Sequence, residues 1–498
     1  MVELGSDPKG SVSEGYFSLR EAVRRKDFGK KVVVGLLFVV LLAFMLHLRQ
    51  VPMQKEILFK SLFSTPFMMA GSFLLSIAFA VISCIYFRIY QRTFLRSFQK
   101  FSLLVTIVAL TLVLAKASEL YLFHYDLINY PLLMPFAAIL ISLLVSTEVA
   151  LFTSGFLTII LGISLPTLQE RFLVMNLMAA LVAIISSHGI RKRKEVFAVC
   201  AKVYLGCAFL VVTYHVFDHK LDPASIGVDL LTTFVFLFAT ALLVVGILPI
   251  LEWAFLVITD MKLIEYMDPN HELLCRLSAE IPGTYQHSLV IGNLSERAAT
   301  AIGANGLFCR VASLYHDVGK LVNAQYFIEN QADGFNMHQL LTPRESASLI
   351  IAHVVEGERL AKKHHLPQSF IDIIRQHHGT TLAYYFYCKQ RALGNVEEQE
   401  FRYPGPRPQT RESAILMIAD CIEAASRALD EVTEESVRKM IEQIVADKIE
   451  DRQFDECPLT FQELDRVKRS FTQTLLVSAH LRVKYQLRPT RASLAIPK

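Results

Sequence analysis

The chain changes character near residue 260, where long apolar runs give way to amphipathic segments. The first part contains eight apolar runs, most of them close to the 20 residues or so that a helix needs to cross a bilayer. The runs are Val32–Leu48, Pro66–Phe87, Ser102–Phe123, Leu132–Val145, Val149–Leu165, Leu173–Gly189, Val203–Phe217 and Val228–Ile258. We therefore predict a polar tail over residues 1–31, followed by a transmembrane domain of about eight helices with short loops over residues 32–260.

From Met261 onward, apolar residues recur at helical spacing, and Gly or Pro marks the breaks between segments. Little of this part has the alternating pattern of a strand, and the proline-rich segment Phe401–Thr410 reads as a loop. The pattern predicts an all-helical soluble domain over residues 261–480 and a C-terminal tail over residues 481–498. The expected fold class is all-α: a polytopic transmembrane bundle followed by a helical domain.

Basic residues cluster beside alternate apolar runs and thereby indicate an orientation in the membrane. The groups are the run RRKDFGKK before Val32, four basic residues from Arg88 to Lys100, and the run Arg191–Lys194. Loops rich in Lys and Arg stay in the cytoplasm. With an even number of spans, both the N-terminus and the soluble domain are then expected in the cytoplasm.

Charge and cysteine content narrow the function classes. The formal net charge is only +4, so bulk electrostatics gives no reason to expect binding to a nucleic-acid polymer. The eight cysteines form no CxxC pair. A disulfide framework is therefore not expected, which agrees with a soluble domain in a reducing cytoplasm.

The soluble part contains candidate metal ligands, each within a segment that reads as helix. They are His287, His316, Asp317, His353, His377, His378 and Asp420. Imidazole and carboxylate groups bind divalent metals such as Mn, Fe, Zn or Co. Seven ligands are too many for one tetrahedral ion and suit two ions that share a bridging carboxylate. Adjacent helical side chains diverge by about 100°, so the pair His377–His378 needs the helix end that Gly379 provides.

The ligand order H…HD…H…HH…D is that of two-metal HD-domain phosphohydrolases. Together with GTYQHS, YHDVGK, QHHGTTL and AILMIADCIEAASRAL, it resembles the seven-transmembrane HD family of bacterial cyclic di-AMP phosphodiesterases. The resemblance covers residues 263–429 closely and the membrane half in layout. It implies a multi-pass protein of the bacterial inner (plasma) membrane. Many family members carry a folded extracellular region after the first span, whereas here only Arg49–Ser64 stands at that place.

The resemblance also implies a mechanism. One divalent ion would be bound by His287, His316, Asp317 and Asp420, and the other by Asp317, His353, His377 and His378. Mn²⁺ or Fe²⁺ is expected at both positions, with Asp317 as the bridge. A hydroxide formed between the ions would attack phosphorus and convert cyclic di-AMP to pApA. The enzyme would thus lower the level of a second messenger in response to a membrane or external signal.

Several further residues are candidates for catalysis or substrate binding. Lys320 follows Asp317 by one turn and can reach a phosphate oxygen, although a cation there can equally satisfy helix-end carbonyls. His338 is a candidate phosphate ligand or proton donor. Tyr385 belongs to an aromatic run that offers faces for adenine stacking, or simply core packing. Tyr285 and Arg407 are the remaining candidate substrate contacts.

Other functions stay open at this point. A membrane receptor that binds a nucleotide without cleaving it would need no catalytic ions. A hydrolase of cyclic di-GMP or another nucleotide is a variant of the same class, but the GYP signature of the cyclic di-GMP enzymes is absent. A transporter is disfavoured because the membrane half shows no repeated pair of broken helices. The expected partners are cyclic di-AMP and the lipid bilayer, and the sequence leaves open whether two copies form a homodimer.

Overall fold

The computed structural model describes residues 29–44, 66–91, 94–95, 97–124, 131–164, 169–219, 221–331, 336–429 and 431–480. The chain divides into two compact units, Met1–Met261 and Lys262–Lys498. Within the described ranges every regular element is a helix, and the β pairing is limited to one isolated bridge between Leu382 and Arg402. The predicted all-α class is confirmed. The predicted tail 481–498, the loop Arg49–Ser64 and residues 1–28 lie outside the described residues.

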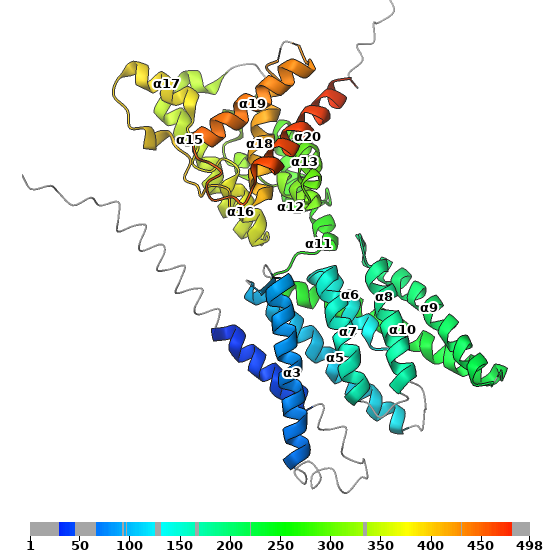
Figure 1. Ribbon diagram of the computed structural model, residues 1–498. Coiled ribbons are helices and arrows are strands. Elements are labelled where there is room, and N and C mark those ends of the chain that lie inside the picture. Colours follow the sequence, from blue (N-terminus) through cyan, green and yellow to red (C-terminus); the bar gives the residue numbers. More distant parts are fainter. Residues whose placement is uncertain are drawn as a thin grey trace, which may run out of the picture. The chain divides into compact units, whose positions relative to one another are not determined.

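The first unit is a bundle of apolar helices, and each predicted span coincides with one of them (Figure 1). They are residues 29–44, α3 (Pro66–Tyr90), α5 (Phe98–His124), α6 (Met134–Leu144), α7 (Thr147–Ser164), α8 (Gln169–Ser186), α9 (Glu195–Phe217) and α10 (Pro223–Phe255). Four of these, α3, α5, α9 and α10, contain segments long and apolar enough to cross a membrane. The first unit is therefore that of a multi-pass membrane protein, and the count of eight spans stays a prediction.

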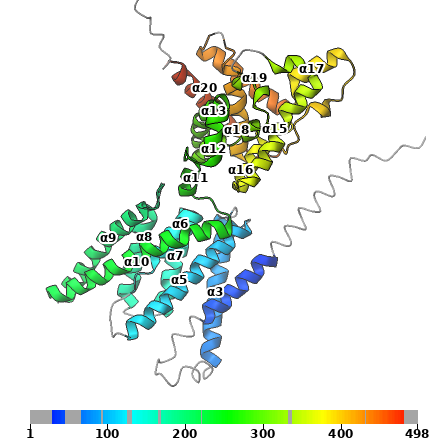
Figure 2. The same ribbon diagram turned by 180° about the vertical axis from the view of Figure 1, so that it is seen from behind.

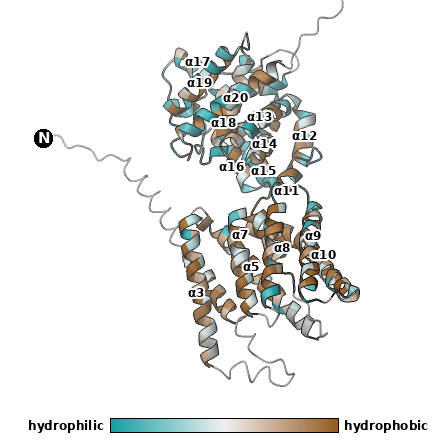
Figure 3. Cartoon of the chain, turned by 45° about the vertical axis from the view of Figure 1, so that its right-hand side comes forward, coloured by the Kyte–Doolittle hydropathy of each residue, from teal (hydrophilic) through white to brown (hydrophobic). Residues whose placement is uncertain are grey.

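The helices of this bundle are apolar along their length, as Figure 3 shows by the brown colour along α3 and α5. Large side chains on the long helices are exposed, among them Leu74 at 67%, Phe209 at 73% and Leu231 at 62%. A soluble protein rarely exposes so continuous an apolar surface. Helices that are hydrophobic on all sides are those that face lipid or lie within a core.

Helix α6 differs from its neighbours because it is short and lies inside the bundle. Its 11 residues rise about 16 Å, roughly half the thickness of the hydrocarbon core. Its N-terminus is satisfied by Asn176 of α8, a fully buried residue whose Oδ1 accepts hydrogen bonds from the amides of Leu133 (2.9 Å) and Met134 (3.2 Å). Backbone ends at membrane depth require such internal partners, so Asn176 allows a helix to begin within the apolar core.

The second unit is a bundle of helices (Figure 2). Its α-helices are α11 (Asp260–Tyr266), α12 (Glu272–Glu280), α13 (Pro282–Ala301), α14 (Gly306–Ser313), α15 (Pro343–Lys363), α16 (Gln368–Gln376), α17 (Tyr384–Leu393), α18 (Arg411–Ser426), α19 (Glu434–Glu450) and α20 (Phe461–His480). Five short 3-10 helices fill the connections: η1 (Val318–Leu321), η2 (Ala324–Tyr326), η3 (Ile328–Asn330), η4 (Met337–Leu340) and η5 (Glu398–Phe401). Helix α13 packs against α14, α18 and α20. Capping boxes at Thr342, Thr410 and Thr433 begin α15, α18 and α19, as their sequences favour.

An aromatic cluster joins the start of this unit to its centre. The Tyr315 hydroxyl, on a fully buried side chain, donates a hydrogen bond to the carbonyl of Tyr266 at the end of α11 (2.6 Å). The ring of Phe370 lies 5.5 Å from that of Tyr315 and 5.1 Å from that of Tyr266. Tyr315 directly precedes the predicted metal ligands His316 and Asp317. The aromatic cluster therefore connects α11 to the segment that carries these two residues.

Candidate metal centre

The structure brings all seven predicted metal ligands into one buried cluster, although they come from five different segments. Helix α13 carries His287, α15 carries His353 and α18 carries Asp420, whereas His316 and Asp317 occupy the turn between α14 and η1. His377 and His378 follow the last residue of α16. Two groups have ligand atoms within 4.8 Å of one another: His353, His377 and His378, and His287, His316 and Asp317.

Asp317 lies between the two groups, and each of its carboxylate oxygens faces one of them. Its Oδ1 is 3.3 Å from Nε2 of His353 and 3.7 Å from Nε2 of His377. Its Oδ2 is 3.3 Å from Nε2 of His316 and 3.7 Å from Nε2 of His287. This is the arrangement expected of a carboxylate that bridges two cations.

Two polar atoms in this cluster are buried and make no hydrogen bond to any described residue, namely Asp317 Oδ1 and His316 Nε2. Buried polar groups are nearly always paired, and an exception needs a physical explanation. One cation in each group would satisfy these atoms, because His316 Nε2 belongs to one group and Asp317 Oδ1 faces the other. The donor set of imidazole nitrogens and carboxylate oxygens therefore fits divalent metal ions.

Hydrogen bonds to backbone carbonyls on the far side of three imidazoles orient these rings. Nδ1 of His316 donates to the carbonyl of Ser313 (2.7 Å), and Nδ1 of His377 donates to the carbonyl of Ile374 (2.8 Å). His353 is held in the same way by a carbonyl three residues earlier on its own helix. A proton on Nδ1 leaves the lone pair of Nε2 facing the cluster, which is the usual arrangement for metal-binding histidines.

Burial and charge set protonation states that suit metal binding. Burial lowers the pKa of His353 to about 4, and it also lowers the pKa of His378 well below its usual value, so both rings are neutral at pH 7. Burial alone would raise the pKa of Asp317, but His316 and Lys320 outweigh it and hold that pKa well below the usual range. The cluster thus combines two neutral imidazoles, those of His353 and His378, with the ionised carboxylate of Asp317.

His287 sits between two carboxylates of α18. Its Nε2 is 3.1 Å from Oδ1 of Asp420, and its Nδ1 is 2.6 Å from Oε2 of Glu423. Burial by itself lowers the pKa of His287, but these two hydrogen bonds outweigh it and raise the pKa to about 10. Asp420 also lies 3.6 Å from Nδ1 of His378, so it reaches both histidine groups.

Lys320 forms ion pairs with two carboxylates. Its Nζ is 2.8 Å from Oδ2 of Asp317 and 2.7 Å from Oε1 of Glu329, and the side chain is only 12% exposed. These carboxylates raise the pKa of the lysine despite its burial. The ammonium group therefore stays charged beside the bridging carboxylate. Its predicted contact with a phosphate oxygen stays a prediction.

The four predicted substrate contacts lie at different places. Tyr285 is partly buried in the first turn of α13, two residues before His287. Nε2 of His338 is 2.8 Å from the carbonyl of Tyr326, and its ring packs 5.2 Å from that of Phe386. Tyr385 is 62% exposed beneath Lys389. Arg407 lies against the turn after His378, with Nε 3.4 Å from the Thr380 hydroxyl.

Two residues near the centre were not among the predicted site residues. Glu423 supports His287, and the spacing Asp420-x-x-Glu423 on one helix face was the available signal. Tyr403 lies in the proline-rich segment, which was read only as a loop. Its ring stacks on that of His378 at 4.3 Å, and burial raises the pKa of its hydroxyl. No local pattern relates residue 403 to residue 378.

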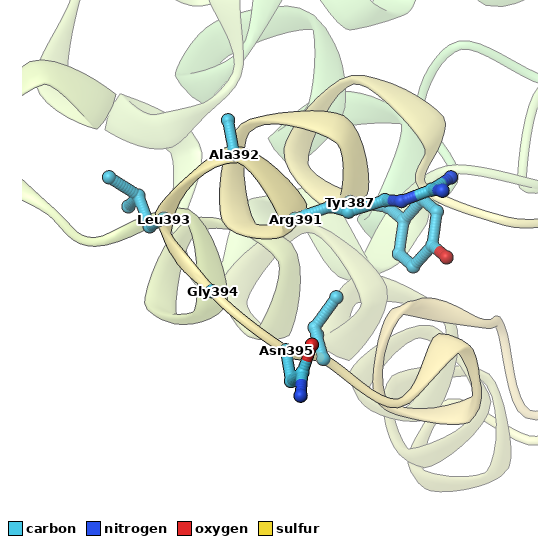
Figure 4. A pocket seen from close by; sticks show the side chains of 7 residues that line it. Tyr387, Arg391, Ala392, Leu393, Gly394 and Asn395 are labelled. Carbon is cyan, nitrogen blue, oxygen red and sulfur yellow. The ribbon is translucent and has the colours of Figure 1, made fainter.

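A separate pocket of about 430 Å³ lies at the end of α17 (Figure 4). It is lined by Tyr387, Arg391, Ala392, Leu393, Gly394, Asn395 and Val396. None of these is a predicted metal ligand. The metal cluster and this pocket are thus distinct features of the second unit.

Comparison with known proteins gives two matching family models. The model described as a 7TM receptor with intracellular HD hydrolase matches residues 66–259, and the HD domain model matches residues 284–425. The helices α3 and α5 to α10 lie within the first match, and all seven predicted ligands lie within the second. The predicted boundary near residue 260 falls between the two matches.

Two curated relatives are similar to about half of the chain. The cyclic-di-AMP phosphodiesterase PgpH of Bacillus subtilis is 43% identical over 266 residues, which are 53% of this chain and 37% of the relative. The protein of the same name from Listeria monocytogenes is 43% identical over 249 residues, 50% of this chain and 35% of the relative. The chain thus spans little more than a third of the length of these relatives.

A solved structure is also similar: the L. monocytogenes phosphodiesterase PgpH HD domain in complex with cyclic-di-AMP. It is 44% identical, covers 42% of this chain and 99% of its own, and has a TM-score of 0.42. The chain thus joins a membrane domain similar to that of the 7TM receptors with intracellular HD hydrolase to an HD domain, and both curated relatives are similar to it at 43% identity.

Proposed function

We propose that this protein is a membrane-anchored, metal-dependent phosphodiesterase that hydrolyses cyclic di-AMP to pApA. The observation that supports it most directly is the position of Asp317, which presents one carboxylate oxygen to each of two histidine groups. Two relatives at 43% identity carry the name cyclic-di-AMP phosphodiesterase. Because the chain spans only part of those relatives, substrate and product are proposals for this protein.

We assign seven side chains to two divalent ions, with Mn²⁺ or Fe²⁺ as the expected metals. The first set is His287, His316, Asp317 and Asp420, and the second is Asp317, His353, His377 and His378. Such ions, when bound, supply an activated water and neutralise charge on phosphoryl oxygens. Two metal sites suit the hydrolysis of a phosphodiester, because the attacking oxygen and the leaving oxygen both need stabilisation.

The chain's own residues would orient the substrate and keep the ligands in the required protonation states. Lys320 is a charged donor within 2.8 Å of Asp317, where it can meet a phosphate oxygen next to the ions. The neutral His353 and His378 keep lone pairs available for coordination. We assign secondary roles in substrate binding to Tyr285, His338, Tyr385 and Arg407, as the sequence predicts.

The membrane half would anchor this chemistry at a bilayer. Four helices are long and apolar enough to cross, and the basic loops favour a cytoplasmic N-terminus and a cytoplasmic HD domain. We propose the inner membrane of a bacterium as the location, because cyclic di-AMP would be met in the cytoplasm. A signal from the membrane or the outside would act through the helices of the first unit.

The test uses the full chain, purified in detergent and loaded with Mn²⁺. Digests of cyclic di-AMP and cyclic di-GMP at equal concentration are analysed by chromatography, and pApA is the expected product. Asp317→Ala is expected to lower kcat/KM on the order of 1000-fold or more, because a bridging ligand is lost. Asp465→Ala, at a carboxylate 49% exposed on α20, is the matched control and should retain activity.

The same experiment separates this proposal from its alternatives. Intact cyclic di-AMP after incubation with metal-loaded protein would contradict the proposal. If the nucleotide binds without being cleaved, the protein is a receptor instead. Faster cleavage of cyclic di-GMP would retain the reaction and change the substrate.

A further inference from the structure

The ligands His377 and His378 stand at the end of a helix, where the backbone must be held by other parts of the chain. Helix α16 ends at Gln376, and Gly379 adopts a left-handed conformation with φ of 54°. This break lets two consecutive side chains turn toward one centre, which a continuous helix does not permit. The second ligand set therefore depends on this turn, because it contains both His377 and His378.

Gln453, from the connection between α19 and α20, holds this turn. Its side-chain oxygen accepts a hydrogen bond from the amide of Thr380 (3.0 Å), and its Nε2 donates to the Thr380 hydroxyl (3.0 Å). The same Nε2 also donates to the carboxylate of Asp451 (2.9 Å). Gln453 is fully buried, so its amide is satisfied entirely inside the protein.

Arg402 binds the other backbone group of Thr380. Its guanidinium donates to the carbonyl of Thr380 (2.7 Å) and pairs with Asp451 (2.9 Å). Both backbone groups of Thr380 are therefore hydrogen-bonded: the amide to Gln453 and the carbonyl to Arg402. Two residues after His378, the backbone has little freedom to move.

The backbone before Gln453 is itself in an uncommon conformation. Arg452 has φ of 57°, in the left-handed region that non-glycine residues seldom adopt. Such conformations persist where the surrounding structure determines them, and they occur often at functional sites. Here the conformation directs a buried amide toward the histidine turn.

Gln453 also packs closely against Gly379. A Cβ atom on Gly379 would stand 2.4 Å from Oε1 of Gln453 and 2.8 Å from Cε of Met417. The glycine and the glutamine thus fit together closely. This close fit suits a contact that sets the position of the turn.

We propose that Gln453 is a positioning residue for the metal centre, acting through Thr380 to hold His377 near Asp317 and His378 near Asp420. The inference rests on the proposed function, since it concerns the same ligand set. Gln453 lies beyond residue 425, where the HD domain match ends. The helices α19 and α20 would thereby support metal binding from outside the matched HD segment.

The test compares Mn²⁺ binding by the full chain and by Gln453→Met, a substitution of similar size that makes neither hydrogen bond. Binding is followed by electron paramagnetic resonance, which detects free Mn²⁺ without any assay of cleavage. Partners that orient metal ligands typically contribute 10- to 100-fold to metal affinity. We expect Gln453→Met to bind one of two ions at least about tenfold more weakly, with its unfolding temperature measured alongside.

Two comparisons make the outcome decisive. Gln443→Met changes an exposed glutamine on α19 and should bind Mn²⁺ as the wild type does. Thr380→Val keeps the backbone amide and is expected to weaken binding less than Gln453→Met. If Gln453→Met lowers the unfolding temperature but binds both ions normally, its role is structural and the inference is wrong. If the wild type itself binds no Mn²⁺, the proposed function fails first.

Discussion

Gly319→Ala is the substitution whose effect follows most directly from the geometry of the centre. Gly319 lies in η1, two residues after Asp317, where η1 crosses α15. A Cβ atom at this position would stand 1.8 Å from the carbonyl oxygen of His353 and 2.5 Å from the amide nitrogen of Gly357. Both are backbone atoms of α15, so a change of side-chain conformation cannot relieve the contact.

The required displacement can be worked out from these distances. Real Cβ atoms essentially never come within 3.0 Å of another heavy atom, so the contact of 1.8 Å must lengthen by at least 1.2 Å. Asp317 moves with one side of this contact and His353 with the other. Metal–ligand distances tolerate only about 0.2 Å. An opening of 1.2 Å is therefore several times larger than a shared ion can accept.

We expect Gly319→Ala to lose at least one of two Mn²⁺ ions and to lower the free energy of unfolding by about 1–3 kcal/mol, as overpacking does. Metal stoichiometry is measured on the full chain by electron paramagnetic resonance. Gly246→Ala in α10, where nothing lies within 4 Å of the added atom, is the control. Two ions bound at wild-type affinity by Gly319→Ala would refute the reasoning, because η1 and α15 would then not determine the ligand spacing.

Two further substitutions test the support around the ligands. Glu423→Gln should weaken metal binding about 10- to 100-fold, measured by calorimetric titration. Because the pKa of His287 in the metal-free protein is raised from 6.5 to about 10, its stabilising contribution is complete below pH 6.5 and is lost as the pH rises through 10. Thermal unfolding in the presence of a chelator should show this loss of stability with rising pH in the wild type and a smaller loss in Glu423→Gln. Equal losses in the two proteins would exclude Glu423 as a cause of the raised pKa of His287. Tyr315→Phe removes the hydrogen bond to the carbonyl of Tyr266, which should lower the free energy of unfolding by about 0.5–1.5 kcal/mol and speed hydrogen exchange over residues 260–271. Tyr266→Phe keeps that acceptor and should exchange normally.

The sequence alone predicts the division of the chain and the ligand types. Apolar runs and helical periodicity are local patterns, so they locate helices and the boundary near residue 260 without knowledge of the fold. The turn after α16 was also expected: Gly379 adopts the left-handed conformation predicted for it, although the helix itself ends earlier, at Gln376. Chemistry of the side chains likewise indicated two ions.

Only the tertiary structure decided how these groups are arranged and supported. Asp317 faces two histidine groups because α13, α15, α16 and α18 converge on one turn, and no period in the sequence links segments that far apart. Glu423 behind His287, Tyr403 on His378 and Gln453 beneath Thr380 are all contacts across long stretches of chain. Their energies depend on burial and on distances of a few ångströms, which arise only when helices pack.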